Sequence, residues 1–124
     1  RRQKALGNAD SLLAQAREID GFKVLAVATE GNRDALRAMA DKLRDQLKSG
    51  VVVLGAVEDD KVTLLAAVTK DLAGGRVHAG KLIGEVAQMV GGRGGGRPDF
   101  AQAGGTQPDQ LPLALERVFE IVAP

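Results

Sequence analysis

The chain has 124 residues, of which 44% are hydrophobic and 27% charged, and its formal net charge is +1. This length supports one hydrophobic core, and the composition is that of a folded domain rather than a disordered chain. Because the sequence has no cysteine and a single histidine, His78, it excludes disulfides, thiol nucleophiles and Cys/His zinc sites. It also has no apolar run of about 20 residues and no signal-peptide core, which predicts a cytoplasmic protein without a membrane partner.

The N-terminal segment predicts a helix. Leu6, Ala9, Leu13 and Ala16 recur at spacings of three and four, so they share one helical face. The abrupt start on charged residues favours a piece of a longer helical linker, whose preceding part continued into a coiled coil. We therefore divide the chain into a helical linker segment, residues 1–20, and a globular domain, residues 21–124.

The next segments predict an α/β fold with a mixed β-sheet flanked by helices. "FKVLAVAT" is typical of a strand, and "VVVLGAV" and "VTLLAAVT", joined by "EDDK", predict a hairpin of strands covered on both faces. A helix is predicted between the first strand and the hairpin: Asn32 is a good N-cap for it, and Gly50 suits its C-terminal cap. The apolar positions of this helix are Leu36, Met39, Ala40, Leu43 and Leu47. Its outer face, with Arg37, Asp41, Arg44, Asp45 and Lys48, is mixed in sign and is interpreted as solvated.

Two more helices are predicted after the hairpin. One carries Leu82, Ile83, Val86, Ala87 and Val90 on a single face and runs directly into a glycine-rich stretch. The closing helix carries Leu111, Leu115, Val118 and Val122, and Pro108 and Pro112 are confined to its first turns.

The stretch 91–105, "GGRGGGRPDFAQAGG", has three interpretations. In the first, Gly91–Gly96 form the floor of an anion site in which peptide N–H groups converge, with Arg93 and Arg97 as charged walls. In the second, the stretch is a flexible linker, although it lacks serine and only one helix follows it. In the third, the glycines are structural and permit close packing of a helix against the sheet.

The basic residues near this stretch support anion binding. Residues 70–97 carry five basic and two acidic side chains, among them Lys70, Arg76 and Lys81. His78 is either a helix cap or a contact to phosphate or ribose, and Phe100 is either a core residue or a base-stacking platform. No nucleophile with a paired base is visible, and no phosphate-loop motif follows the glycines. The sequence therefore predicts binding without catalysis.

"VHAGKLIGEVAQMVGGRGGGRPDFAQAGG", preceded by "GVVVLGAVEDDKVTLLAAVTKDL", resembles the C-terminal domain of bacterial alanyl-tRNA synthetases, a domain of the DHH-phosphoesterase-associated type. The resemblance implies a non-catalytic domain that binds the elbow of alanine-specific tRNA, aids alanylation and editing by the rest of the synthetase chain, and dimerises through its helical part. It implies ATP, Mg²⁺ and zinc for the parent alanine-tRNA ligase, and no cofactor, metal or catalytic residue for this fragment.

The basic block and the resemblance together give a set of candidate residues. The expected RNA-binding residues are Lys70, Arg76, His78, Lys81, Gly91, Gly92, Arg93, Gly94, Gly95, Gly96, Arg97 and Gln102. The expected structural anchors of the loop are Pro98, Asp99, Phe100, Gly104 and Gly105. Two alternatives remain: the substrate-binding domain of a DHH-type nucleotide phosphoesterase, and an interaction module that forms a homodimer through the N-terminal helix.

Overall fold

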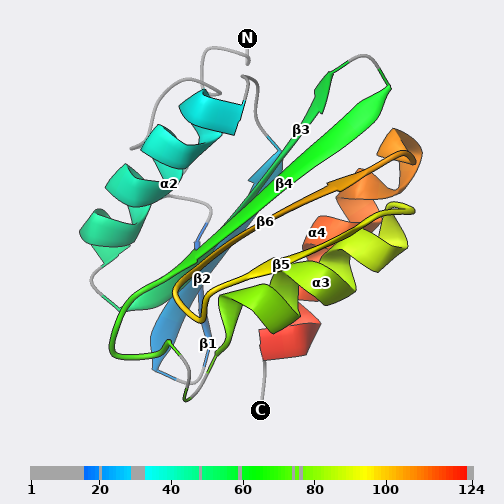
Figure 1. The fold of residues 1–124 in the computed structure, drawn as a ribbon. Coiled ribbons are helices and arrows are strands. Elements are labelled where there is room, and N and C mark those ends of the chain that lie inside the picture. The colour runs from blue at the N-terminus through cyan, green and yellow to red at the C-terminus, as the bar shows by residue number, and fades with distance from the viewer. Residues whose placement is uncertain are drawn as a thin grey trace, which may run out of the picture.

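The computed structural model describes residues 16–19, 21–28, 33–47, 49–58, 60–73, 75 and 77–122. They form a six-stranded mixed sheet with the strand order β1-β2-β3-β4-β6-β5. Figure 1 shows one helix, α2, on one side of the sheet and two helices, α3 and α4, on the other. The predicted α/β fold with a helix-flanked mixed sheet is confirmed for these residues.

The sheet begins with two short antiparallel strands, β1 (Arg17–Ile19) and β2 (Phe22–Ala28). The prediction of helix is wrong for 17–19, because Ile19 pairs with Phe22 across a turn in which Gly21 has a φ of 91°. This pairing with β2 outweighs the local helical periodicity. Ala16 is not helical either, and residues 1–15 and 20 of the predicted helical linker lie outside the described residues. The predicted dimer contact therefore stays a prediction.

The helix α2 (Arg33–Leu47) connects β2 to the parallel strand β3 (Gly50–Glu58). Its predicted apolar face is confirmed, since Leu36 and Leu43 are fully buried in a core shared with Leu25. The expected N-cap, Asn32, lies outside the described residues. Gly50 is not a helix cap as expected: it opens β3, where a Cβ would lie 2.5 Å from the Lys23 carbonyl oxygen. It therefore lets β2 and β3 approach each other.

The predicted hairpin is confirmed as β3 and β4 (Lys61–Val68), which pair antiparallel over eight residue pairs. Both strands contribute to two cores, one under α2 and one under α3 (Ala79–Met89) and α4 (Leu111–Val122). A 3₁₀ turn, η2 (Pro108–Gln110), precedes α4. None of the helices in the described ranges has the length and apolar character needed to cross a membrane.

The glycine-rich stretch differs most from its prediction. It was expected to be a loop, but it contains β5 (Arg93–Gly96) and β6 (Phe100–Gly105), an antiparallel pair. β6 pairs with β4, so β5 becomes the edge strand of the sheet. Glycine has a low intrinsic preference for strands. This segment is a strand pair because β6 pairs with β4, which fixes its register.

Candidate nucleic-acid interface

The turn between β5 and β6 is fixed at one end of the sheet by three backbone hydrogen bonds. The Val68 N–H donates to the Asp99 carbonyl at 2.9 Å, and the Ala79 N–H donates to the Pro98 carbonyl at 2.9 Å. The Arg97 N–H donates to the Phe100 carbonyl, also at 2.9 Å, and closes the turn. The last residue of β4 and the first residue of α3 therefore meet at this turn.

These contacts bring cations from separate segments to the same end of the sheet. Lys70 follows β4, Lys81 lies in the first turn of α3, and both are exposed. The Arg97 side chain is 72% exposed, and its Nε lies 3.7 Å from Asp99 Oδ1. We call Lys70, Lys81 and Arg97 the cationic end of the sheet. Arg76 lies outside the described residues.

His78 is the N-cap of α3. Its Nδ1 accepts a hydrogen bond from the Lys81 N–H at 3.2 Å, which satisfies one of the free donors at the start of the helix. The capping interpretation is therefore confirmed. Because Nδ1 accepts this bond, a contact of the ring to phosphate or ribose would have to use Nε2.

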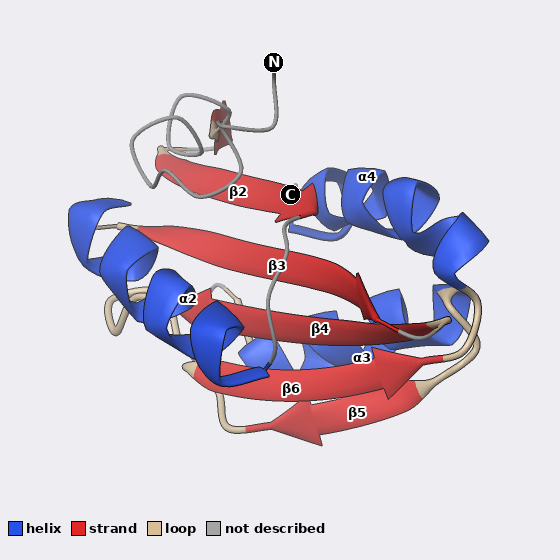
Figure 2. Ribbon diagram, turned by 90° about the horizontal axis from the view of Figure 1, so that it is seen from above, coloured by secondary structure: helices blue, strands red, loops and turns tan. Residues whose placement is uncertain are grey.

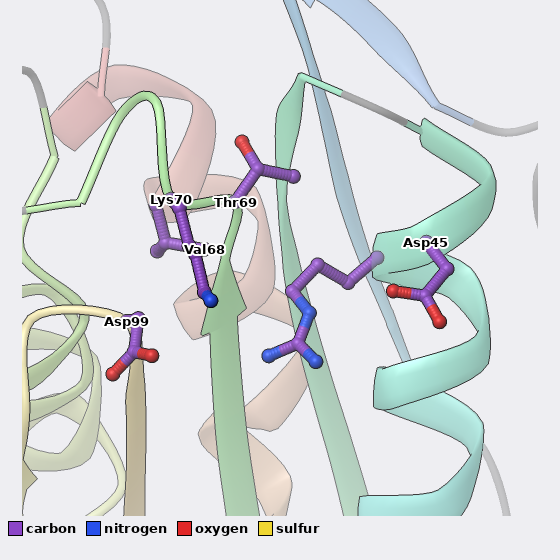
Figure 3. A pocket seen from close by; sticks show the side chains of 6 residues that line it. Asp45, Val68, Thr69, Lys70 and Asp99 are labelled. Atoms are coloured by element: carbon purple, nitrogen blue, oxygen red, sulfur yellow. The ribbon is translucent and has the colours of Figure 1, made fainter.

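A hollow of about 410 Å³ lies at the same end of the sheet, beside α2. It is lined by Arg44, Asp45, Val68, Thr69, Lys70 and Asp99. Figure 3 shows Asp45 on α2 across the hollow from Lys70 and Asp99. Since two cations and two carboxylates line it, the hollow by itself is a weak site for an isolated anion.

A hydrogen-bonded carboxylate fixes the chain where it leaves β4. The Ser49 Oγ donates to Asp71 Oδ2 at 2.5 Å, and this bond, together with one from Thr69, holds the pKa of Asp71 below its usual value. Thr69 Oγ1 in turn accepts from the Gly50 N–H at 3.0 Å. The start of β3 is thus tied to the segment that carries Lys70.

The first two glycines of the stretch end the helix α3. Gly91 has a φ of 74°, its N–H donates to the Gln88 carbonyl at 3.3 Å, and the Gly92 N–H donates to the Ala87 carbonyl at 2.9 Å. This pattern is a Schellman motif, in which glycine adopts the left-handed conformation without strain. The predicted floor of converging N–H groups is therefore wrong: Gly91 and Gly92 cap the helix, and the extended strand β5 turns successive N–H groups to opposite sides.

The face of the β5–β6 hairpin that points toward α3 is closed. Ala101 and Ala103 of β6 belong to the core on the α3 side, and Gly96 and Gly94 lie opposite them in β5. A Cβ on Gly80 of α3 would lie 2.7 Å from the Gly96 carbonyl oxygen. The structural interpretation of the glycines, close packing of a helix against the sheet, is confirmed on this face.

The other face of the hairpin carries Arg93 and Gly95 from β5, and Phe100, Gln102 and Gly104 from β6. Phe100 is 9% exposed and belongs to the core under α2, which confirms the core interpretation of this ring. Gly104 and Gly105 end β6. Gly104 lies beside β4, and Gly105 lies so close to Val90 that a Cβ on Gly105 would overlap the valine side chain. Figure 2 shows that α2 leaves β5 and most of β6 uncovered on this face.

Two arginines of α2 that were assigned to a solvated face lie beside this region. The Arg37 guanidinium carbon is 5.0 Å from the centre of the Phe100 ring, and Arg44 lines the hollow and pairs with Asp41 at 3.3 Å. A spacing of seven residues places both arginines on one helix face. Nothing in the sequence indicates that this face lies next to β6, because that contact depends on the position of β6 in the sheet.

No group of three or more histidine, aspartate or glutamate side chains that could hold a metal ion occurs among the described residues. The polar side chains of this region are the exposed cations Lys70, Lys81 and Arg97, the carboxylates Asp45 and Asp99, and the amide of Gln102. The region is suited to binding a polyanion.

Known proteins share this fold and sequence. The model of the DHHA1 domain family matches residues 20–123. An alanine–tRNA ligase from Cupriavidus necator is 57% identical over 120 residues, and one from Anaeromyxobacter dehalogenans is 52% identical over 123 residues. These alignments cover 96% and 99% of this chain but 14% of each relative, so the chain spans about one seventh of the length of these ligases.

A solved structure gives the same result. The crystal structure of the C-Ala domain from Aquifex aeolicus alanyl-tRNA synthetase superimposes with a TM-score of 0.81 and 33% sequence identity, covering 88% of this chain and 98% of that one. The resemblance noted in the sequence is thereby confirmed over nearly the whole chain. The chain belongs to the DHHA1 domain family and matches the C-Ala domain of alanyl-tRNA synthetases.

Proposed function

We propose that this domain is a non-catalytic tRNA-binding module of an alanine–tRNA ligase, and that it contacts the elbow of alanine-specific tRNA through the cationic end of the sheet. In this role it holds the tRNA while other domains of the ligase carry out alanylation and editing. The domain itself turns over no substrate.

The observation that carries the proposal is the convergence of Lys70, Lys81 and Arg97 at the β5–β6 turn. These three residues come from separate segments, and the hydrogen bonds of Pro98 and Asp99 hold those segments together. Exposed cations on a rigid backbone are suited to phosphate groups, which carry most of the affinity of RNA-binding surfaces. The N-terminus of α3 adds partial positive charge next to Lys81.

The relatives supply the identity of the proposed partner. The named alanine–tRNA ligases act on tRNA, and the matched C-Ala domain is a part of such an enzyme. Recognition of RNA by shape and phosphate does not require the stacked aromatic platforms of single-strand binders, and this chain has only three phenylalanines and no tyrosine or tryptophan.

Footprinting tests the proposal. The chain is mixed with a transcript of alanine-specific tRNA at two salt concentrations, and backbone cleavage is mapped along the RNA. We expect protection confined to the elbow at low salt and weaker protection at high salt, because phosphate contacts are screened. Protection of the acceptor end or the anticodon instead, or no protection at low salt, would contradict the proposal.

A further inference from the structure

The face of the β5–β6 hairpin that points away from α3 is open at its centre. A Cβ on Gly95 would meet no atom within 4 Å, and Gly95 lies directly opposite Gln102 of β6. A shallow hollow of about 230 Å³ covers this point, lined by Gly95, Gly96, Arg97, Phe100, Ala101 and Gln102. The sheet therefore offers a shallow surface here, open above Gly95 and bordered by the side chains of Arg97, Phe100 and Gln102.

Planar cations border this surface. The Arg97 side chain is mostly exposed, and the Asp99 carboxylate holds its Nε at 3.7 Å. On the α2 side, the Arg37 guanidinium lies over the Phe100 ring at 5.0 Å. Guanidinium groups stack on flat rings and attract the phosphates that flank them in a nucleic acid. The lining of the hollow contains one cation and no carboxylate, so its charge complements RNA.

We infer that this open face binds one exposed nucleobase of RNA. The base lies flat over Gly95 with the Arg97 guanidinium against it, and the amide of Gln102 forms hydrogen bonds with the edge of the base. Gln102 is half-buried on this same face, opposite Gly95, and its side-chain amide has both donors and acceptors to offer. Phe100 lies on this same face beside the surface and is not the stacking platform itself, because its ring is buried in the core under α2 and Arg37 lies over it.

A nucleobase fits this face better than a phosphate group does. A phosphate site needs several donors that converge on one point, but the extended strand β5 turns its N–H groups to alternate sides. The only charged side chain that lines the hollow, among the described residues, is that of Arg97. Lys70 and Lys81 do not line this hollow and are expected to contact phosphate alone, whereas Arg97 lies between the cationic end and the open face and contributes to both.

The inference rests on the proposed tRNA binding, and the test separates the two. Affinity for a fluorescent transcript of alanine-specific tRNA is measured at several salt concentrations for the unaltered chain, Gly95→Val and Arg97→Lys. Valine favours strands and enters open space at position 95, so the fold should persist while the base is blocked. Lysine keeps the charge at position 97 and removes the planar stacking surface.

We expect each substitution to weaken binding about tenfold, as loss of one stacked base does, without changing the slope of affinity against salt. Gln102→Ala should weaken binding severalfold, whereas the exposed Gln88→Ala on α3 serves as the matched control and should bind normally. The side-chain amide signals of Gln102 in an NMR spectrum should shift when the RNA is added.

Two results would overturn the inference. If the unaltered chain binds the transcript and Gly95→Val and Arg97→Lys bind it equally well, the open face holds no base and the phosphate contacts stand alone. If the unaltered chain does not bind the transcript even at low salt, the proposed function fails and the inference fails with it. If Gly95→Val does not fold, the smaller substitution Gly95→Ala replaces it in the binding measurement. Normal binding by Gly95→Ala, together with unchanged Gln102 amide signals when RNA is added, would then overturn the inference.

Discussion

The glycines of the β5–β6 hairpin have different surroundings on its two faces. Toward α3, the backbone of Gly96 lies so close to Gly80 that a single added methyl group would collide with a carbonyl oxygen. Toward the side of α2, the backbone at Gly95 has open space above it. A run of glycines can therefore close one face of a strand by tight packing and leave the other flat and accessible. Only the second face and the turn beyond it are available to a partner.

The largest expected effect concerns the ring that lies beside the open face. Phe100→Ala removes a buried ring from the core under α2, and substitutions of this kind cost roughly 3–5 kcal/mol of unfolding free energy. Urea unfolding followed by circular dichroism measures the loss. A loss below about 1 kcal/mol would show that this ring does not hold β6 against α2.

A matched pair of helix substitutions tests the closed face. Gly80→Ala places a methyl group 2.7 Å from the Gly96 carbonyl oxygen and should cost roughly 1–3 kcal/mol through overpacking. Gly84→Ala meets its nearest atom, the Gly94 carbonyl oxygen, at 3.6 Å and should gain up to about 1 kcal/mol from helix propensity. Urea midpoints of the two variants should move in opposite directions. Equal shifts would contradict the close approach of α3 and β5.

A second matched pair tests which end of the sheet binds RNA. Lys61 and Lys70 are exposed and lie at opposite ends of β4, with only Lys70 at the cationic end. Lys70→Ala should weaken tRNA binding severalfold and reduce the salt slope by roughly 1, because one phosphate contact is lost. Lys61→Ala should leave both quantities unchanged. Equal effects of the two variants would mean that tRNA binding depends on the total charge of the chain and not on the cationic end of the sheet.

The smallest expected effect is a pH dependence near Lys70. The pKa of Asp71 is lowered in the folded chain by its bonds to Ser49 and Thr69, so the ionised form stabilises the fold. This contribution is present above the unfolded pKa of about 3.8 and is lost as the pH falls through the lower folded value. Asp71→Asn should therefore unfold at slightly less urea than the unaltered chain at pH 7, and this difference should shrink as the pH is lowered below about 3.8. No difference at pH 7 would contradict the role of the Ser49 bond.

The parts of the fold in which apolar residues recur in a clear pattern could be predicted from the sequence. Leu36, Leu43 and their neighbours mark α2, and two apolar runs around a polar turn mark the β3–β4 hairpin. The β5–β6 hairpin could not be predicted, because glycines carry no alternating pattern and their pairing depends on β4. For the same reason the helix predicted over 17–19 proved to be β1, whose structure comes from pairing with β2.

The candidate site could be predicted in its composition but not in its arrangement. The basic block and the glycine stretch indicate where the proposed binding residues lie along the chain, and Lys70, Lys81 and Arg97 do lie close to the same turn. The expected floor of peptide N–H groups is replaced by a helix cap and a strand. Arg37 and Arg44 were missed because only the packing of α2 against the sheet brings Arg37 next to Phe100 of β6 and Arg44 next to the end of β4.

Hydrogen–deuterium exchange of the chain with and without alanine-specific tRNA tests the central claim most directly. We predict slower exchange with RNA at the end of β4, the start of α3 and residues 95–102, and unchanged exchange at the β3–β4 turn and in α4. Protection that centres on the β3–β4 turn or α4, with none around the β5–β6 turn, would contradict the claim that tRNA binds to the open face of this hairpin and to the cationic end of the sheet.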